Sequence, residues 1–306
     1  MKVRFNWFTA DFDKKNNFLL DALLLHFENV SVTSSRFANC DIEFIAVTKP
    51  LPHQHVARAN RIYSNVPHGQ ADISLLYPTA FHPKTWNSER RIWYGVENLR
   101  PPFQDDIDAA LSFEQDPLGG YNAYFPPWYE LSGLQKPFLN RRVGVTIWAP
   151  NLLKERSLIR TKKKFACAFL GKPDQTRFWA IKELSRIGQV DVFGPLVGRP
   201  IPNKREIAKE YKFMLCFEND LYPGYVSEKP LEAYLSETVP LYWGDLGSDD
   251  SINRLSLINL REFENMEQWI SAIQNLTESE YSQIYRQPFL KSLPNLSGIY
   301  RILTNT

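Results

Sequence analysis

A group of charged and amide side chains follows an apolar run at residues 213–217. The run stops at Glu218-Asn219, a loop with glycine, proline and tyrosine comes next, and Ser227-Glu228-Lys229 then opens an amphipathic segment. Free backbone N–H groups at the start of a helix, with a lysine beside them, suit a phosphate group. The pattern therefore predicts an anion site at the edge where parallel α/β sheets bind their ligands.

A plain structural role for the same triplet stays open. Ser227 is a good N-cap, and Pro230 is tolerated in a first helical turn. A capped helix with a solvated Glu228–Lys229 pair would therefore show the same sequence pattern. The neighbouring residues favour a ligand site, because Glu218-Asn219 could bind hydroxyl groups and Tyr225 offers a flat ring. Together these groups would suit a nucleotide-sugar diphosphate.

Two further positions could complete such a site. Arg177 opens an expected helix, and a guanidinium there could clamp a diphosphate; taken alone, an exposed first-turn arginine is the better interpretation. Glu97 ends an apolar strand and precedes Asn98. A partly desolvated carboxylate at that place could take a proton from a sugar hydroxyl. A carboxylate bonded to its own loop explains Glu97 about equally well.

Metal and cofactor patterns are weak. Asp106-x-Asp108 leads into an expected strand, and Asp249-Asp250 lies in a polar loop. His53-x-His55 has no third ligand nearby, so solvated turns and a surface loop are favoured and no metal ligand is expected. The chain shows no Walker loop, no dinucleotide-binding glycine pattern after a strand and no nucleophile elbow. These observations argue against kinases, dehydrogenases and α/β-hydrolases.

The composition is that of a globular protein with a substantial core. Of 306 residues, 43% are hydrophobic and 23% charged, and the net charge of +2 is too small to indicate nucleic-acid binding. Three widely spaced cysteines are expected to be buried free thiols in a reducing compartment. The sequence shows neither a membrane span nor a cleavable signal pattern, so we expect a cytoplasmic protein.

Strand-like and helix-like patterns alternate along the chain, which predicts an α/β architecture. In the first half we expect strands at 3–8, 41–47, 91–96 and 108–113, and a helix at 16–27. In the second half we expect strands at 165–170, 190–193, 213–217, 239–243 and 257–260. Helices are expected there at 176–187, from 227, at 264–276 and from Thr277, whose spacing to Glu280 resembles a capping box.

The segment from Lys212 to Gly244 resembles the C-terminal motif of the α-1,3/α-1,4-fucosyltransferases, especially the bacterial ones. The match runs through Phe217-Glu218-Asn219, Tyr225-Val226-Ser227-Glu228-Lys229, Ala233, and Val239-Pro240 to Gly244. Weaker matches lie at 164–177 and at 91–113. The resemblance extends from about Ile92 to Leu276, and Pro230 stands where the family usually has a large apolar residue.

The resemblance implies a GT-B fold with two Rossmann-like domains facing each other across a cleft. Residues 1–150 would form an acceptor-binding domain, 151–164 a linker, and 165–290 a domain that binds a GDP-sugar. The remaining segment, 291–306, is expected to pack back on the N-terminal domain.

The resemblance also implies an inverting transfer of L-fucose from GDP-β-L-fucose to a glycan hydroxyl in an α-1,3-type linkage. Glu97 would be the general base and Asn98 would contact the acceptor. Arg177 and Lys229 would hold the diphosphate, and the donor site would be completed by Asn219, Tyr225, Ser227 and Glu228. No cofactor would be required, and stimulation by Mn²⁺ or Mg²⁺ is left open.

The expected partners are GDP-fucose and an oligosaccharide or lipid-linked glycan, such as an N-acetyllactosamine-like, lipopolysaccharide O-antigen or capsule acceptor, with no nucleic acid. Peripheral association with the inner face of a bacterial membrane is left open. Two alternatives also stay open. A GT-B transferase could use another GDP-sugar, because helix geometry and charge recognise a diphosphate rather than a hexose. The same scaffold could instead serve a non-catalytic glycan- or nucleotide-binding protein.

Overall fold

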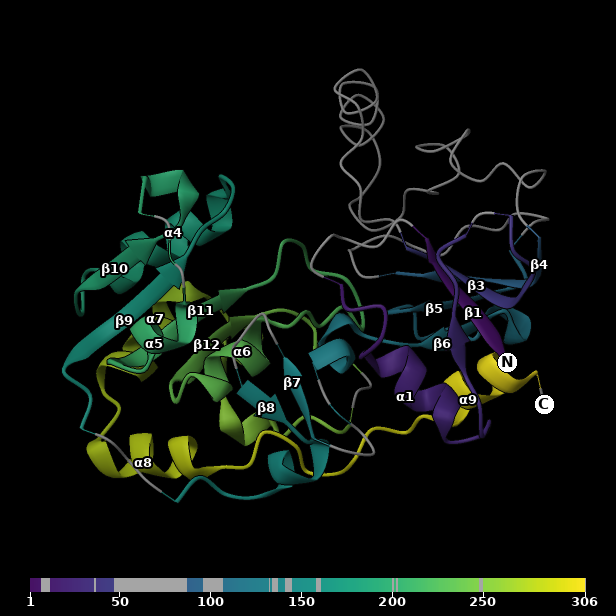
Figure 1. The fold of residues 1–306 in the computed structure, drawn as a ribbon. Coiled ribbons are helices and arrows are strands. Elements are labelled where there is room, and N and C mark those ends of the chain that lie inside the picture. Colours follow the sequence, from purple (N-terminus) through teal and green to yellow (C-terminus); the bar gives the residue numbers. More distant parts are fainter. Residues whose placement is uncertain are drawn as a thin grey trace. The chain divides into compact units, whose positions relative to one another are not determined.

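The computed structural model describes residues 1–6, 12–35, 37–46, 87–95, 107–131, 133, 137–140, 145–157, 161–199, 201, 203–247 and 250–305. The chain forms two compact units (Figure 1). The first unit comprises Met1–Gln135, Tyr222–Tyr225 and Asn295–Thr306, and the second comprises Lys136–Leu221 and Val226–Pro294.

The first unit is built on a six-stranded sheet in which every neighbouring pair is parallel, in the order β2-β1-β3-β4-β5-β6. The strands are β1 (Lys2–Asn6), β2 (Ser31–Val32), β3 (Cys40–Ala46), β4 (Ser88–Tyr94), β5 (Ala109–Ser112) and β6 (Asn122–Tyr124). In its described residues this unit also contains the α-helices α1 (Phe18–Leu24) and α9 (Ser297–Thr304) and the 3₁₀ helices η2 (Leu118–Gly120) and η3 (Pro127–Leu131). Strand β3 is almost continuously buried, as expected of an interior parallel strand covered on both faces.

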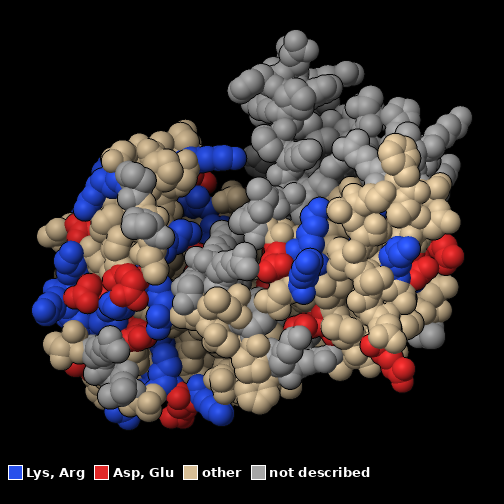
Figure 2. Space-filling model, in the orientation of Figure 1, with Lys and Arg blue, Asp and Glu red and all other residues tan. Residues whose placement is uncertain are grey.

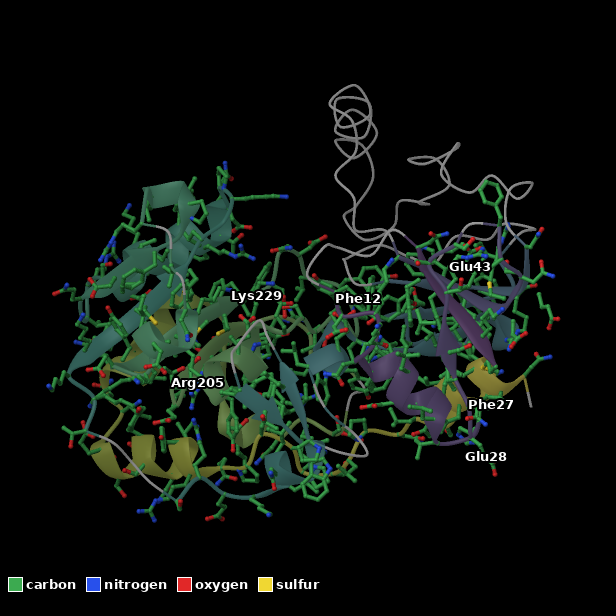
Figure 3. All side chains as sticks on the ribbon, in the orientation of Figure 1. Phe12, Phe27, Glu28, Glu43, Arg205 and Lys229 are labelled. Carbon is green, nitrogen blue, oxygen red and sulfur yellow. The ribbon has the colours of Figure 1, made fainter. Side chains whose placement is uncertain are left out.

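A buried carboxylate ties three strands of this sheet together. Glu43 on β3 is fully buried and forms ion pairs with Arg4 on β1 and Arg91 on β4, each at 3.4 Å (Figure 3). Asn6 and Ser88 also donate to its carboxylate. Burial raises the pKa of Glu43 above its ordinary value, although the two arginines act in the opposite direction. The cluster fixes the register of the central strands.

The second unit contains a five-stranded parallel sheet in the order β10-β9-β11-β12-β13. Its strands are β9 (Lys164–Phe169), β10 (Val190–Phe193), β11 (Tyr211–Phe217), β12 (Val239–Trp243) and β13 (Ile258–Asn259), beside an antiparallel hairpin of β7 (Phe138–Asn140) and β8 (Val145–Ile147). The α-helices are α4 (Gln175–Leu184), α5 (Lys204–Ala208), α6 (Lys229–Leu235), α7 (Met266–Gln274) and α8 (Glu278–Arg286). The 3₁₀ helices are η4 (Ala149–Leu153), η5 (Pro195–Val197), η6 (Arg254–Ser256) and η7 (Leu260–Glu262).

Two helices of the second unit, α8 and α4, are capped as local sequence rules predict. The capping box predicted at Thr277 and Glu280 is present, and Asp174 caps α4 by accepting the backbone N–H of Arg177 at 2.8 Å. On α4, Phe178 is 44% exposed. Ala180 and Leu184, four residues apart, are the buried positions of this helix.

The three cysteines are buried free thiols, as predicted. Burial raises the pKa of each thiol above its ordinary value. Among the described residues, no helix has the length and apolar character that crossing a membrane requires.

Figure 2 shows Lys and Arg side chains interspersed with Asp and Glu over one face of the second unit. The ion pairs of this unit include Lys209–Glu206 and Lys212–Glu278.

The units have other bounds than the expected domains 1–150 and 165–290. The first unit comprises the chain up to Gln135 and two later segments, Tyr222–Tyr225 and Asn295–Thr306. The segment Asn295–Thr306 contains α9, which packs against α1, β5 and β6. Arg90 on β4 donates to the carbonyl oxygens of Ile302 (2.6 Å) and Leu303 (3.4 Å) at the end of α9. A cation at a helix C-terminus is a favourable contact, which helps to hold this helix on the sheet.

Arg156 lies in the segment expected to be a linker, yet it is built into the second unit. Its Nε donates to the carbonyl oxygen of Tyr285 at 2.6 Å, and one Nη donates to those of Tyr234 (3.2 Å) and Thr238 (3.1 Å). The guanidinium carbon also lies 4.2 Å from the ring centroid of Tyr234 and 4.0 Å from that of Tyr285. Arg156 thus joins its own segment to the C-terminal ends of α6 and α8.

We expect Arg156→Lys to lower the free energy of unfolding by about 2–4 kcal/mol, because an ammonium can neither stack between two rings nor reach three carbonyl groups in a plane. Urea unfolding measures this change. Lys154→Ala, which alters an exposed lysine of the same segment, serves as the control and should leave stability nearly unchanged. A loss no larger in Arg156→Lys than in the control would contradict the structural role.

Candidate functional site

The order of the second sheet marks one edge position as special. Strand β9 lies between β10 and β11, so the chain leaves β9 toward one side and later returns on the other. The loops that follow β9 and β11 therefore run in opposite directions from the carboxyl ends of these two strands. Parallel α/β sheets bind ligands in the crevice between such loops. Arg177 follows β9, and Asn219 follows β11.

A fully buried carboxylate is at the centre of this edge. Glu218 directly follows β11 and is 0% exposed. It accepts hydrogen bonds from the backbone N–H of Ser227 (2.8 Å), the hydroxyl of Ser227 (2.6 Å), the ammonium of Lys229 (2.9 Å) and the hydroxyl of Tyr242 (3.2 Å). Four donors, one of them a cation, offset the cost of burying the charge.

Lys229 places its ammonium beside this carboxylate (Figure 3). Its Nζ donates to Glu218 Oε2 and to Ser227 Oγ, both at 2.9 Å, and its side chain is 22% exposed. Burial alone would lower the pKa of Lys229, but Glu218 and then Glu228 raise it, so that the pKa lies above its ordinary value. The residue is therefore a cation at neutral pH, with a further N–H for another acceptor.

Arg177 supplies a second cation at the same strand end. Its Nε and one Nη donate to the carbonyl oxygen of Phe217, at 3.2 and 2.9 Å, and that Nη also donates to the side chain of Asn219. The positive charge of Arg177 acts to lower the pKa of Lys229, so the two cations repel each other. An anion bound beside both would relieve this repulsion.

The predicted N-cap at Ser227 was wrong. Helix α6 begins at Lys229, and its cap residue is Glu228, whose side chain makes no capping bond. The Ser227 hydroxyl donates to Glu218 instead and accepts from the Lys229 ammonium and, at 3.3 Å, from the Lys229 backbone N–H. Ser227 therefore joins the site through the carboxylate rather than through the helix.

Tyr225, which was predicted to offer a flat ring to the ligand, is buried. Tyr225 belongs to the first unit, is 2% exposed and packs edge-on against Phe113, with ring centroids 5.2 Å apart. A ring so deeply buried has no open face, so its predicted stacking role finds no support here. Glu97 and Asn98 lie outside the described residues. No group of three His, Cys, Asp or Glu side chains in the described part of the chain could hold a metal ion.

The glycine that follows β12 gives the carboxylate its room. A Cβ added at Gly244 would lie 2.3 Å from the Tyr242 hydroxyl oxygen and 2.8 Å from Glu218 Cγ. The sequence pattern indicated that Glu218 and Asn219 could bind hydroxyl groups, but it gave no sign of Tyr242 or of the need for glycine. The available signal was the position of Glu218 at the end of a continuously apolar strand, where a carboxylate must be buried and paired.

Gly244→Ala should lower the free energy of unfolding by about 1–3 kcal/mol, because the surrounding groups are buried and have no direction in which to move. Thermal or urea unfolding measures this loss. Gly171→Ala is the matched control, since a Cβ at that position would meet nothing within 4 Å. Equal stability of the two variants would show that the close approach at Gly244 is not structurally important.

Residues 159–289 match the model of the C-terminal region of glycosyltransferase family 10 (fucosyltransferase). The chain is similar to this family over that part of its length. Every member of the described cluster, from Arg177 to Gly244, lies within the family 10 region.

Proteins similar to this chain occur in bacteria and animals. The chain is 25% identical over 252 residues to the α-(1,3)-fucosyltransferase FucT of Helicobacter pylori, which covers 72% of this chain and 51% of that protein. It is 29% identical over 90 residues to 4-galactosyl-N-acetylglucosaminide 3-α-L-fucosyltransferase 9 of Homo sapiens, covering 28% of this chain and 25% of that protein. The chain thus spans about half the length of the first relative and a quarter of the second.

Solved structures show the same fold. A crystal structure of an α1,3-fucosyltransferase has a TM-score of 0.64 at 22% identity and covers 95% of this chain and 83% of that chain. A structure of α1,3-fucosyltransferase with GDP-fucose also covers 95% of this chain and 83% of that chain, with a TM-score of 0.63 at 21% identity. The expected GT-B fold class is confirmed, while the placement of the two units across a cleft stays a prediction.

Proposed function

We propose that this chain transfers L-fucose from GDP-β-L-fucose to a hydroxyl group of a glycan. One observation carries the proposal: Arg177 and Lys229 both lie at the carboxyl end of β11, inside the region that matches family 10. The names of the relatives support the sugar and the α-1,3 linkage, and the structure solved with GDP-fucose supports the donor.

In this proposal the second unit binds the departing group. Arg177 and Lys229 bind the diphosphate, and Asn219, Ser227 and Glu228 complete the donor site. Fixed cations at the end of a strand stabilise the negative charge that develops on GDP as the bond to fucose breaks. Because these groups supply the positive charge, we expect turnover without an added divalent ion.

The first unit would supply the base and the acceptor site. Glu97 takes the proton of the acceptor hydroxyl while that oxygen bonds to C1 of fucose. The bond from C1 to the β-phosphate oxygen breaks in the same step, and its electron pair leaves on GDP. Attack from the opposite face converts the β-linked donor into an α-linked product. Asn98 would orient the acceptor, for which an N-acetyllactosamine-like, O-antigen or capsule glycan is our proposal.

A donor and acceptor panel tests this function. The protein is incubated with GDP-fucose, GDP-mannose or UDP-galactose, each with β-galactosyl and N-acetyllactosamine acceptors, and both nucleotide release and the product linkage are measured. We expect release of GDP from GDP-fucose alone and an α-fucoside as the product. Release from GDP-mannose alone would instead show a transferase for another GDP-sugar. No release with any pair would favour a binding protein on the same scaffold.

A further inference from the structure

Glu218 has no part in the proposed chemistry, yet it accepts hydrogen bonds from two of the proposed donor-site residues. It binds both Ser227 and Lys229 and is fully buried, so it cannot meet a substrate itself. We propose that Glu218 is a positioning residue that acts through Lys229, holding its ammonium at the phosphate-binding edge. This inference rests on the proposed function for the identity of the phosphate.

Several hydrogen bonds hold the Glu218 carboxylate, so its position is fixed. The backbone N–H of Glu218 donates to the carbonyl oxygen of Trp243 at 2.8 Å, which ties residue 218 to the end of β12. Tyr242, itself fully buried, donates to one carboxylate oxygen, and the Ser227 hydroxyl donates to the other. Gly244 leaves the space that this arrangement occupies.

A fixed partner matters for lysine because its side chain is long and flexible. Holding such a side chain in one geometry costs rotamer entropy. In this chain, contacts with Glu218 and Ser227 alone hold the Lys229 ammonium. A preorganised cation needs little rearrangement when charge develops on the leaving group, which is the condition for effective electrostatic stabilisation.

The carboxylate also keeps the ammonium charged. The groups that act on Lys229 are its own burial and Arg177, which lower its pKa, and Glu218 and Glu228, which raise it. Glu218→Gln removes the larger of the two raising charges but keeps the size of the side chain. The pKa of Lys229 should then fall, and the positive charge should be lost at a lower pH than in the wild-type protein.

The direct test is the titration of Lys229 in protein carrying ¹³C-labelled lysine, followed by NMR in wild type and in Glu218→Gln. We expect the transition to move down by at least about one pH unit, the shift that corresponds to a tenfold change in equilibrium. Glu232→Gln is the control: it removes another buried carboxylate, on α6, that pairs with Lys204 rather than Lys229. An unchanged transition in Glu218→Gln would overturn the proposal.

Activity provides the second readout. In Glu218→Gln we expect kcat with GDP-fucose to fall about 10- to 100-fold, the acceptor KM to stay near its wild-type value, and the alkaline limb of the pH profile to move to lower pH. Tyr242→Phe removes a neutral donor from the carboxylate and should leave that limb in place. If both variants lose activity with unmoved limbs, Glu218 serves only to hold the fold.

A double-substitution cycle separates action through Lys229 from any other effect. In a Lys229→Met background, Glu218→Gln should change kcat less than about twofold, because the group through which it acts is gone. Equal fold-losses in both backgrounds would overturn the proposal. Failure of the proposed function is distinguishable from this outcome: wild-type protein would then transfer no fucose, while the NMR titration would still report on Glu218 and Lys229.

Discussion

Lys229→Met should lower kcat with GDP-fucose by about 10²–10³-fold, the usual effect of removing one group that stabilises developing charge. The Lys229 ammonium is held 2.9 Å from a buried carboxylate and lies at the carboxyl end of β11 together with Arg177. Methionine keeps most of the length of the side chain but has no charge. Because the loss concerns the leaving group, the acceptor KM should change far less than kcat. Steady-state kinetics with varied acceptor measure both quantities.

The same substitution leaves Glu218 buried without its cation, so it also destabilises the fold. The double variant Lys229→Met/Glu218→Gln removes both charges and should recover most of the lost stability without recovering turnover. This pair of variants separates folding from chemistry. Turnover close to wild type in the double variant would show that Lys229 does not stabilise the leaving group.

Glu97→Gln should lower kcat by about 10²–10⁴-fold while leaving the affinity for GDP nearly unchanged, since the proposed base acts on the acceptor and the diphosphate is held by the other unit. In the sequence, Glu97 comes three residues after Tyr94, at which β4 ends. Glutamine keeps the shape of the side chain but cannot accept the proton. Kinetics together with GDP titration measure both effects.

Glu89→Gln is the matched control for Glu97, because it removes an exposed carboxylate from β4 itself. Its kcat should equal that of the wild-type protein. A Glu97→Gln protein that turns over as fast as this control would exclude Glu97 as the base and would leave the acceptor side of the mechanism without a candidate.

The sequence predicted the strand edge well because its signals are local. A continuous apolar run such as β11 indicates a buried parallel strand, and the charged residues that follow must lie at its carboxyl end. Arg177 and Lys229 were assigned to the same ligand on that reasoning, and the structure places both at the end of β11. The capping box at Thr277 was predictable for the same reason, since its bonds span only three residues.

The errors concern contacts between residues distant in sequence. Ser227 fits the N-cap pattern, but its hydroxyl binds Glu218, nine residues earlier, and no local rule includes that competitor. Tyr225 is two residues from Ser227, yet its ring packs against Phe113 in the first unit. The expected linker at 151–164 also involves distant contacts, because Arg156 donates hydrogen bonds to carbonyl groups about 80 and 130 residues further along the chain.

The most direct test of the central claim is a calorimetric titration of guanosine, GMP and GDP into the wild-type protein and into Arg177→Gln/Lys229→Met. If the two cations at the end of β11 hold a diphosphate, affinity for the wild-type protein rises with each phosphate, and the double variant binds GDP no more tightly than guanosine. Equal affinity of the wild-type protein for all three ligands, or an undiminished preference for GDP in the double variant, would contradict the claim.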